Sequence, residues 1–108
     1  MLEIIAEIAN AHQGSPLIAL KLAKSAKNSG ASAVKFQIYD AEAAFSKNEM
    51  TTDVKLDHIY GVKPWWEVAR DIILMPREWF GEMFDYARSK NLIPLSAIHR
   101  PEDADFLQ

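Results

Sequence analysis

The stretch EIIAEIANAHQGSPLIALKLAKSAKNSGASAVKFQIY, residues 3–39, contains two apolar segments that flank an amphipathic one. Residues 2–9 are short, apolar and rich in Ile, which is typical of a parallel strand buried on both faces. Residues 31–39 alternate between apolar and polar side chains and predict a second strand. With a helix between them, the two segments predict a strand–helix–strand unit, in which the strands run parallel and the crossover is right-handed.

The expected helix has a start signal, an apolar face and a stop signal. Ser15 is a good N-cap and Pro16 suits the first helical position. Gly30 indicates the end of the helix, because glycine adopts the backbone conformation that follows a last turn. The apolar stripe is expected to contain Ile18, Leu22 and Ala26, with Ala19 and Ala23 beside it.

The remainder of the chain predicts further helices and a third strand. Residues 40–62 have no sustained period, so we expect a short helical turn at 41–45 and then a long loop, which in compact domains is usually functional or mobile. After this loop the predicted segments are helices at 64–73 and 76–91, a strand at 92–98 that Pro94 weakens, and a helix at 101–107.

Three strands, each followed by a helix, place the chain in the α/β class, and either an open doubly wound sheet or part of a barrel fits. The 108 residues suffice for one domain with one modest core. A net charge of −3 argues against a nucleic-acid partner, and no apolar run reaches the roughly 20 residues that span a bilayer. The chain has no Cys, which excludes disulfides and thiolate metal sites, and we expect a cytoplasmic protein.

Polar residues follow or end each predicted strand, where α/β folds bind their ligands. This set suits a phosphorylated or carboxylated small molecule, and it consists of Glu7, Asn10 and His12 on the first strand, Lys35, Gln37, Tyr39 and Asp40 on the second, and Ser96, His99 and Arg100 on the third.

Most of these residues also have a purely structural interpretation. Glu7 and Lys35 lie at similar heights on neighbouring strands, so they can form an ion pair within the sheet. A loop hydrogen bond is favoured for His12 over a metal ligand, and His99 is as consistent with a solvated strand end as with a site. His58 is assigned no role, and the three Trp residues are expected in the core.

The sequence resembles the sialic acid synthase (N-acetylneuraminate synthase) family. AEIANAHQG at 6–14 is similar to the family's opening AEIG-N-H-G, and Gly30-Ala31 and VKFQ at 34–37 are similar to its next motif. LSAIHRPEDADFL at 95–107 occupies the place of the Ser-Thr-Pro-Phe strand end and the helix after it. The resemblance covers nearly the whole chain and is most specific in the first forty residues.

This resemblance implies a fold and a reaction. Residues 1–108 would be a single partial domain, the N-terminal portion of a TIM (β/α)8 barrel with about three of its eight βα units, because a complete barrel takes about 250 residues. The remaining strands and a C-terminal antifreeze-like domain would lie outside this chain. The implied transferase condenses phosphoenolpyruvate with an N-acyl amino sugar such as N-acetylmannosamine, releases phosphate and forms a nonulosonic acid, and the isolated chain would be inactive.

The resemblance also implies roles for individual residues. Glu7 and Lys35 would be catalytic, with Lys35 contacting phosphoenolpyruvate and Glu7 handling a proton or water. Asn10, His12, Gln37 and Ser96 would bind substrate. The family's divalent metal, Mn or Mg, acts as a Lewis acid on the aldehyde, and no residue of this chain is expected to bind it.

One departure from the family's motif bears on binding, and two other functions remain open. Ala97 stands where the family has a Thr whose hydroxyl helps to hold phosphoenolpyruvate, which points to weaker binding or a divergent subfamily. One alternative is a non-catalytic α/β module that self-associates, and the other is a different barrel enzyme acting on sugar phosphates. We expect a homo-oligomer, because unclosed strand edges expose backbone donors and acceptors.

Overall fold

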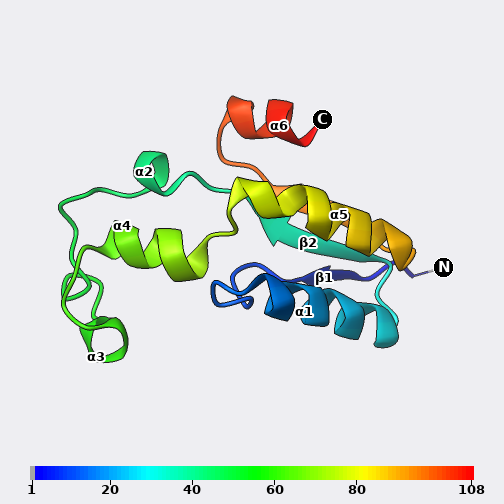
Figure 1. Ribbon diagram of the computed structural model, residues 1–108, viewed down its shortest axis with the longest axis horizontal. Helices are drawn as coiled ribbons and strands as arrows, with labels where there is room; N and C mark the ends of the chain where they lie inside the picture. Colours follow the sequence, from blue (N-terminus) through cyan, green and yellow to red (C-terminus); the bar gives the residue numbers. More distant parts are fainter. Residues whose placement is uncertain (1) are drawn as a thin grey trace.

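The computed structural model describes residues 2–108 and shows a three-stranded parallel sheet with helices packed on one side (Figure 1). The strands are β1 (Ile5–Glu7), β2 (Ala33–Gln37) and β3 (Ile93–Ala97), and β2 lies between the other two. Both pairings are parallel, which confirms the predicted α/β class and the crossover connections.

The helices occupy the predicted positions, with one addition. A short helix that the sequence does not predict, α3, lies inside the segment expected as a long loop, while α2 forms the predicted turn before it. The helical segments are α1 (Pro16–Asn28), α2 (Ala41–Ala44), α3 (Asp57–Tyr60), α4 (Trp65–Val68), the π-helical turn η1 (Ala69–Ile73), the 3-10 turn η2 (Arg77–Trp79), α5 (Phe80–Ser89) and α6 (Pro101–Leu107).

Helix α1 begins as the sequence predicts. The Ser15 hydroxyl accepts a hydrogen bond from the backbone N–H of Ile18 at 3.3 Å, and Pro16 occupies the first turn. The buried face is centred on Ala19 and Ala23 rather than on the predicted stripe, whose first member Ile18 stays 38% exposed. These two small side chains let the helix backbone lie close to the sheet, and this closeness leaves the larger residues at the margins of the contact.

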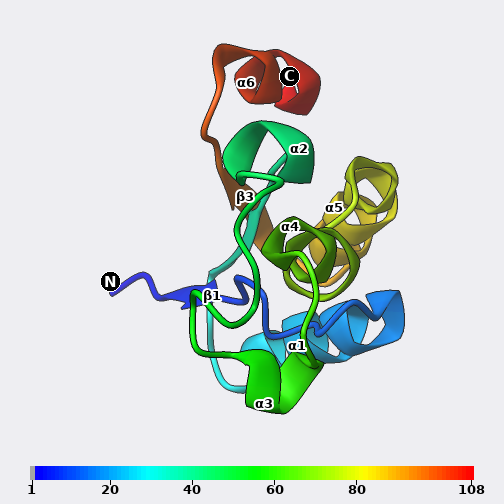
Figure 2. The same cartoon turned by 90° about the vertical axis from the view of Figure 1, so that its left-hand side faces the viewer.

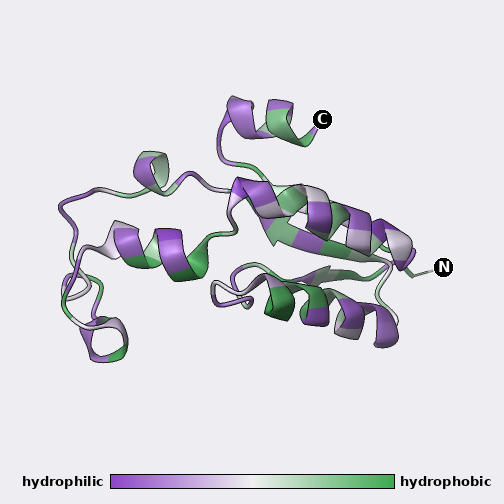
Figure 3. Cartoon of the chain, viewed as in Figure 1, coloured by the Kyte–Doolittle hydropathy of each residue, from purple (hydrophilic) through white to green (hydrophobic). Residues whose placement is uncertain are grey.

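The main core lies between the sheet and helices α1 and α5, which cover the same face of it (Figure 2). Val34, Phe36 and Ile38 of the second strand segment are fully buried, which confirms the predicted alternation. Figure 3 shows hydrophobic colouring along β1 and β2 that hydrophilic bands interrupt in β2. The largest core residues contributed by the helices and by the loop between η1 and η2 are Met75, Phe80 and Met83.

The opposite face of the sheet is not covered by residues 2–108, and here one prediction is wrong. The first strand was expected to be buried on both faces, yet β1 pairs with β2 alone and Ile5 is 56% exposed. Ile93, at the matching position of β3, is 54% exposed. An Ile-rich composition therefore identified the strand correctly, whereas burial depends on elements packed against it, and the helices lie on one side only.

The segment 64–73 is helical as predicted but changes type in the middle. The backbone N–H of Leu74 donates to the carbonyl of Ala69 at 2.8 Å, an i to i+5 bond that marks a π turn. The wider turn rotates the residues after it relative to an α-helix. Val68 and Ala69 are buried, whereas Ile72 and Ile73 after the π turn are only partly buried.

The loop between β1 and α1 passes very close to η1. Gly14 has φ +76°, and a Cβ placed on it would lie 2.5 Å from the carbonyl oxygen of Asp71. Gly30, which ends α1, has φ +95°, but no atom lies within 4 Å of a Cβ at this position. The two glycines therefore share a left-handed backbone and differ in whether a side chain has space.

This difference predicts unequal effects of Gly→Ala substitution. Gly30→Ala should lower the free energy of unfolding by about 1–2 kcal/mol, the cost of a left-handed L-residue. Gly14→Ala should lower it by about 1–3 kcal/mol more, because the π turn has to move away from the new methyl group. Urea denaturation of both variants measures the difference, and equal losses of stability would contradict the close approach.

Candidate functional site

Glu7 and Lys35 form an ion pair on the uncovered face, at the carboxyl end of β1. The two residues are register partners in the parallel pairing, and Lys35 Nζ lies 3.1 Å from Glu7 Oε2. The other carboxylate oxygen of Glu7 accepts a hydrogen bond from the backbone N–H of Ala9 at 3.1 Å. The ion pair suggested by the sequence is therefore present, and the turn after β1 fixes its carboxylate.

The exposure of this pair decides how it is interpreted. The side chains of Lys35 and Glu7 are 38% and 43% exposed. Ion pairs with this access to water contribute about 0–1 kcal/mol, so this one adds little to the stability of the sheet. A Lys ammonium has three donors, and the contact with Glu7 occupies one of them. The pair thus presents a cation that can still bind an anionic group from the open side.

The structure brings some of the other candidate residues to this place and separates others from it. Gln37 follows Lys35 by two positions in β2, so its side chain lies on the same face. Asn10 is exposed in the turn after β1. Ser96, in contrast, is the register partner of the core residue Phe36 and lies on the helix-covered face, where its hydroxyl donates to the carbonyl of Ala97 at 2.9 Å.

Ser96 is thus not gathered with the ion pair, and the physical reason is the alternation of a strand. Its neighbour Ala97 is the register partner of Gln37 and occupies the uncovered face. A one-residue shift moves every side chain to the opposite face, and this register becomes known only from the structure.

His12 is fully buried and also lies away from the open face. Its Nδ1 accepts a hydrogen bond from the backbone N–H of Gly14 at 3.0 Å, which confirms the predicted loop hydrogen bond. The imidazole meets Trp79 edge-on, with ring centroids 5.7 Å apart, and its Nε2 has no hydrogen-bond partner among residues 2–108. Burial without a compensating charge lowers the pKa of His12 below 6.5. His12 therefore shapes the loop from beneath.

A network of charges that the sequence did not predict joins the carboxyl ends of β2 and β3. Asp103 of α6 is fully buried, and its Oδ1 accepts from Arg77 Nη2 at 2.6 Å and from Arg100 Nη2 at 3.2 Å. The backbone N–H of His99 reaches its Oδ2 at 3.4 Å, and Arg100 Nη1 lies 3.5 Å from Asp40 Oδ2. Arg100 thus connects the loop after β3 with the loop after β2.

The network keeps Asp103 ionised. Burial by itself would raise the pKa of this carboxyl, but hydrogen bonds from Arg100, from the His99 backbone and from Arg77 outweigh the burial, so the pKa lies below its usual range. Acidic residues in the first turn of a helix interact favourably with its dipole, so an Asp at this position does not by itself indicate a network. The sequence contained one signal for the ion pair between Arg100 and Asp103. These residues are three positions apart, which is the spacing of a helical ion pair.

Two aromatic rings stack above this network. Tyr39 and His99 lie with ring centroids 3.8 Å apart and an angle of 16° between the planes. Beside them is a cavity of about 140 Å³, located between α2 and the loop that leads into α6. Of the two interpretations left open for His99, a solvated strand end and a site residue, the ring stacking and the adjoining cavity favour the second.

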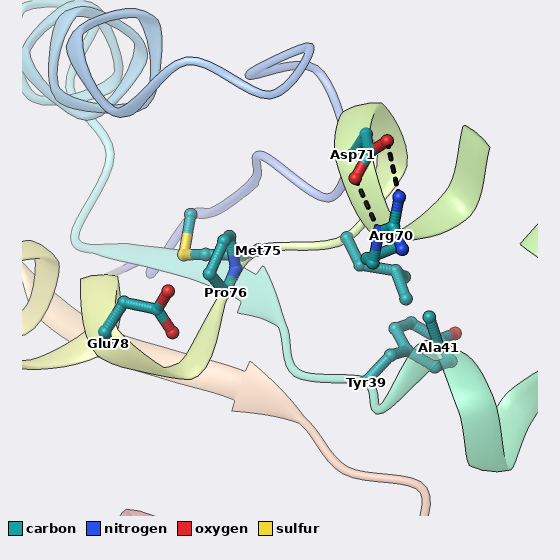
Figure 4. Close-up of a pocket in the computed structure, with 8 residues that line it drawn as sticks. Tyr39, Ala41, Arg70, Asp71, Met75, Pro76 and Glu78 are labelled. Atoms are coloured by element: carbon teal, nitrogen blue, oxygen red, sulfur yellow. Dashed lines mark hydrogen bonds and ion pairs between the residues drawn. The ribbon is translucent and has the colours of Figure 1, made fainter. Parts of the chain in front are cut away.

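A larger cavity of about 450 Å³ lies between α2 and η1 (Figure 4). Arg70 and Asp71 line it and pair with each other through two hydrogen bonds of 2.6 and 3.0 Å, so their charges are mutually neutralised. Neither Glu7 nor Lys35 contributes to this cavity. We therefore place the candidate site at the uncovered strand ends, where a cation with spare donors is available.

Residues 2–108 contain no group of three or more His, Cys, Asp or Glu side chains positioned to hold a metal ion. None of the helices formed by these residues is both long and apolar enough to cross a bilayer.

The buried imidazole predicts a pH-dependent stability. Because the pKa of His12 is lowered in the folded state, the unfolded chain binds the proton more tightly, and stability that is complete above pH 6.5 falls as the pH drops through the folded-state pKa. The slope from this one residue is at most about 1.4 kcal/mol per pH unit. Urea denaturation between pH 7.5 and 5 measures this slope, with both pH values chosen as roughly one unit or more either side of the imidazole's ordinary pKa.

Two variants identify the residue responsible. His12→Asn keeps a hydrogen-bond acceptor for Gly14 and removes the titration, so its stability should be flatter with pH. His58→Asn alters an exposed imidazole and should retain the slope of the unmodified protein. Equal slopes in all three proteins would show that His12 is not the titrating group.

Comparison with known proteins gives a consistent result. Residues 22–108 match the profile of the NeuB family. The chain is 29% identical over 105 residues to a pseudaminic acid synthase of Campylobacter jejuni, and 34% identical over 108 residues to the spore coat polysaccharide biosynthesis protein SpsE of Bacillus subtilis. These alignments include 97% of this chain but 30% and 27% of the two relatives, so the chain spans less than a third of their length.

Solved structures agree with this assignment. The crystal structure of SpsE superimposes with a TM-score of 0.67 at 31% identity, and it covers 99% of this chain and 26% of that one. An N-acetylneuraminic acid synthetase of Leptospira borgpetersenii, crystallised with citrate, shares the fold with a TM-score of 0.71 at 24% identity, covering 96% of this chain and 31% of that one. Because the family profile matches most of the length of this chain, the chain belongs to the NeuB family.

Proposed function

We propose that this chain forms the N-terminal portion of a (β/α)8 barrel in a synthase that condenses phosphoenolpyruvate with an N-acyl amino sugar. The products are a nonulosonic acid and phosphate. Membership of the NeuB family supports this proposal, as do relatives named as sugar acid synthases. The observation that carries it is the Glu7–Lys35 pair, half-exposed at the ends of adjacent parallel strands.

In this proposal the uncovered face of the sheet lines the inside of the barrel. The face carries Ile5 and Ile93 towards the amino ends of the strands and the ion pair towards the carboxyl ends. Barrel interiors are filled by branched apolar side chains, and their chemistry lies at the carboxyl ends. The exposure of two isoleucines is accounted for if five further strands close the barrel over them.

The ion pair supplies two complementary functions. Lys35 has donors left for the phosphate or carboxylate of phosphoenolpyruvate, both of which are anionic. Glu7, whose carboxylate accepts a hydrogen bond from the Ala9 backbone, would accept or deliver a proton at the reacting carbons. Gln37 lies on the same face as Lys35, Asn10 is exposed in the turn after β1, and both would contact the sugar. His12 and Ser96, whose side chains hydrogen-bond within the loop and the strand on the helix-covered side, would contribute to the site indirectly.

A divalent metal, Mn or Mg, belongs to the proposed reaction, in which it would polarise the aldehyde of the sugar. Residues 2–108 offer no cluster of ligands that fits such an ion, so any ligands are expected from polypeptide outside them. The reading frame after the codon for Gln108 provides a first check, because histidines at the ends of later strands are expected there.

Lys35→Ala tests the proposal directly. In the complete polypeptide, loss of the cation should weaken phosphoenolpyruvate binding by at least tenfold, since a hydrogen bond to a charged group contributes about 1.5–3 kcal/mol. The unfolding free energy should change by less than about 1 kcal/mol, because the pair is half-exposed. Steady-state kinetics of phosphate release and urea denaturation measure the two quantities.

Controls separate a site from a structural ion pair. Lys24→Ala removes an exposed cation of α1 and should leave the KM for phosphoenolpyruvate unchanged. If Lys35→Ala destabilises the fold but leaves this KM unchanged, Lys35 has a structural role only. The 108-residue chain alone should release no phosphate from phosphoenolpyruvate, N-acetylmannosamine and manganese, and turnover at a synthase rate would refute the claim that it is inactive.

A second candidate function, self-association, is favoured by the same uncovered face. Both edges of the sheet are unpaired within residues 2–108, and Ile5 and Ile93 each offer apolar area to a second copy. Full burial of an Ile side chain contributes roughly 1.5–3 kcal/mol. We expect the isolated chain to form oligomers, which sedimentation at increasing protein concentration measures.

Matched substitutions locate the contact. Ile5→Lys and Ile93→Lys should shift the chain towards a monomer. Leu17→Lys, which alters a 59% exposed residue of α1, should not. A stable monomer at high concentration would contradict association of the isolated chain.

A further inference from the structure

The loop between β1 and α1 contains three residues with a left-handed backbone. Ala9 and Gln13 have φ of +48° and +53°, a region that residues with a side chain rarely adopt, and Gly14 follows with φ +76°. Such conformations at residues other than glycine persist only where the surrounding contacts determine them, and they are concentrated at functional sites. The loop therefore depends on the contacts that hold it against the core.

His12 supplies the central contact of this loop. Its imidazole is fully buried, and Nδ1 accepts a hydrogen bond from the backbone N–H of Gly14 at 3.0 Å. Its carbonyl oxygen accepts from the backbone N–H of Ser15, the N-cap of α1, also at 3.0 Å. The ring meets Trp79 of η2 edge-on. One residue thus joins the loop to the start of α1 and to the helical layer.

The hydrogen bond from Gly14 assigns the protonation state of the imidazole. A ring nitrogen that accepts a hydrogen bond carries no proton, so the ring is neutral and its hydrogen is on Nε2. A proton added at Nδ1 would place two N–H donors against each other. His12 can therefore carry a positive charge or hold the backbone of Gly14, but not both.

No group in the surroundings stabilises a protonated His12. The side chain has no access to water, and Nε2 has no hydrogen-bond partner among residues 2–108. Burial alone accounts for the lowered pKa of His12, without a contribution from a charged group. The charged side chains on the elements around the loop have partners of their own, line the cavity of Figure 4 or are exposed, and they are Glu7 and Lys35 of the sheet, Lys21 of α1, Arg70 and Asp71 of η1, Arg77 and Glu78 of η2, and Glu82 of α5. An imidazolium at this position would therefore leave the core.

The same loop carries the backbone donor that fixes the Glu7 carboxylate. The N–H of Ala9 donates to Glu7 Oε1 at 3.1 Å and also reaches the carbonyl oxygen of Lys35 at 3.4 Å. Three overlapping turns over residues 8–15, each closed by a backbone hydrogen bond, connect Ala9 with His12. A movement of His12 out of the core would pass through these turns to Ala9, and Glu7 would lose its backbone donor.

We propose that His12 is a positioning residue, whose neutral imidazole keeps the loop in the conformation that orients Glu7 and whose protonation releases this carboxylate. The inference rests on the proposed function for its effect on turnover, and it deepens that function by naming a regulation of the same site. His12 acts through the loop and not by touching substrate. Acidification thereby removes Glu7 from its place, while Lys35 keeps its position in β2.

Nuclear magnetic resonance on the 108-residue chain tests the release without requiring turnover. Over the pH range of the urea experiment, three changes should share one midpoint: protonation of His12 Nδ1, loss of its scalar coupling to the Gly14 amide, and shifts of the Ala9 amide and the Glu7 carboxyl carbon. The amide of Met83, a core residue of α5, should not change.

Three outcomes of this titration would overturn the inference. In the first, His12 is protonated while Ala9 and Glu7 keep their resonances, so that the loop does not transmit the change. In the second, the imidazole stays neutral over the whole range. In the third, the native Met83 amide is lost at the same midpoint, which would show that the whole domain unfolds rather than the loop alone.

Substitutions of His12 separate the hydrogen bond from the titration. His12→Asn keeps an acceptor for Gly14 and has no proton to gain, so Ala9 and Glu7 should keep their resonances at acidic pH. His12→Leu removes the acceptor, so these resonances should already be shifted at neutral pH. His58→Asn, which alters an exposed imidazole, should titrate like the unmodified chain. His12→Asn decides by itself if the Leu variant does not fold, because a retained transition would refute the role of His12.

The pH profile of the complete polypeptide measures the effect on turnover. With phosphoenolpyruvate, N-acetylmannosamine and manganese, kcat should fall about tenfold for each pH unit below the midpoint of His12, because one proton controls Glu7. The KM for phosphoenolpyruvate should change less than kcat, since Lys35 stays in β2. His12→Asn should lack this fall in kcat, whereas His58→Asn should retain it.

The two proposals can fail separately. If the complete polypeptide releases no phosphate, the synthase is rejected, and the shared midpoint of His12, Ala9 and Glu7 still supports or refutes the release of the loop. If phosphate is released and the pH profiles of the unmodified protein and His12→Asn coincide, the synthase is supported and the positioning role of His12 is rejected.

Discussion

The parallel pairing of β2 with both of its neighbours is the constraint on which the rest of the structure depends. Because the strands share one direction, their carboxyl ends meet at a single edge, and the register sets which side chains become neighbours there. Glu7 meets Lys35 for this reason, and the loops after β2 and β3 are brought close enough for Arg100 to contact Asp40. A different register would separate both pairs.

The alternation of β2 gives the sheet an apolar face covered by helices and an uncovered face that carries polar side chains. Val34, Phe36 and Ile38 are fully buried against the helices, where each apolar side chain contributes roughly 1.5–3 kcal/mol. Lys35 and Gln37 between them face the uncovered side, so a polar site does not interrupt the core. The strand can therefore carry a charge in its middle without the desolvation penalty that a two-sided core would impose.

Local signals in the sequence were sufficient for much of the fold. The Ser15 cap, the Pro16 start and the alternation of β2 depend on neighbouring residues, and the structure confirms them. The exposure of β1, the face of Ser96 and the network around Asp103 depend on register and on packing between distant segments. Such features follow from tertiary contacts that composition and periodicity do not encode, which is why the candidate site was predicted only in part.

The carboxylate of Asp103 and the Glu7–Lys35 ion pair differ in their burial and in how many of their hydrogen-bonding groups have partners. Asp103 is fully buried and accepts hydrogen bonds from two guanidinium groups and a backbone N–H. Removing these donors would leave a buried charge uncompensated. Glu7 and Lys35 are each more than a third exposed and engage through a single contact. A saturated, buried group can hold loops but cannot exchange partners, whereas an unsaturated, accessible one can. The proposed function therefore assigns ligand contact to Lys35, whereas Asp103 holds the loops after β2 and β3 in place.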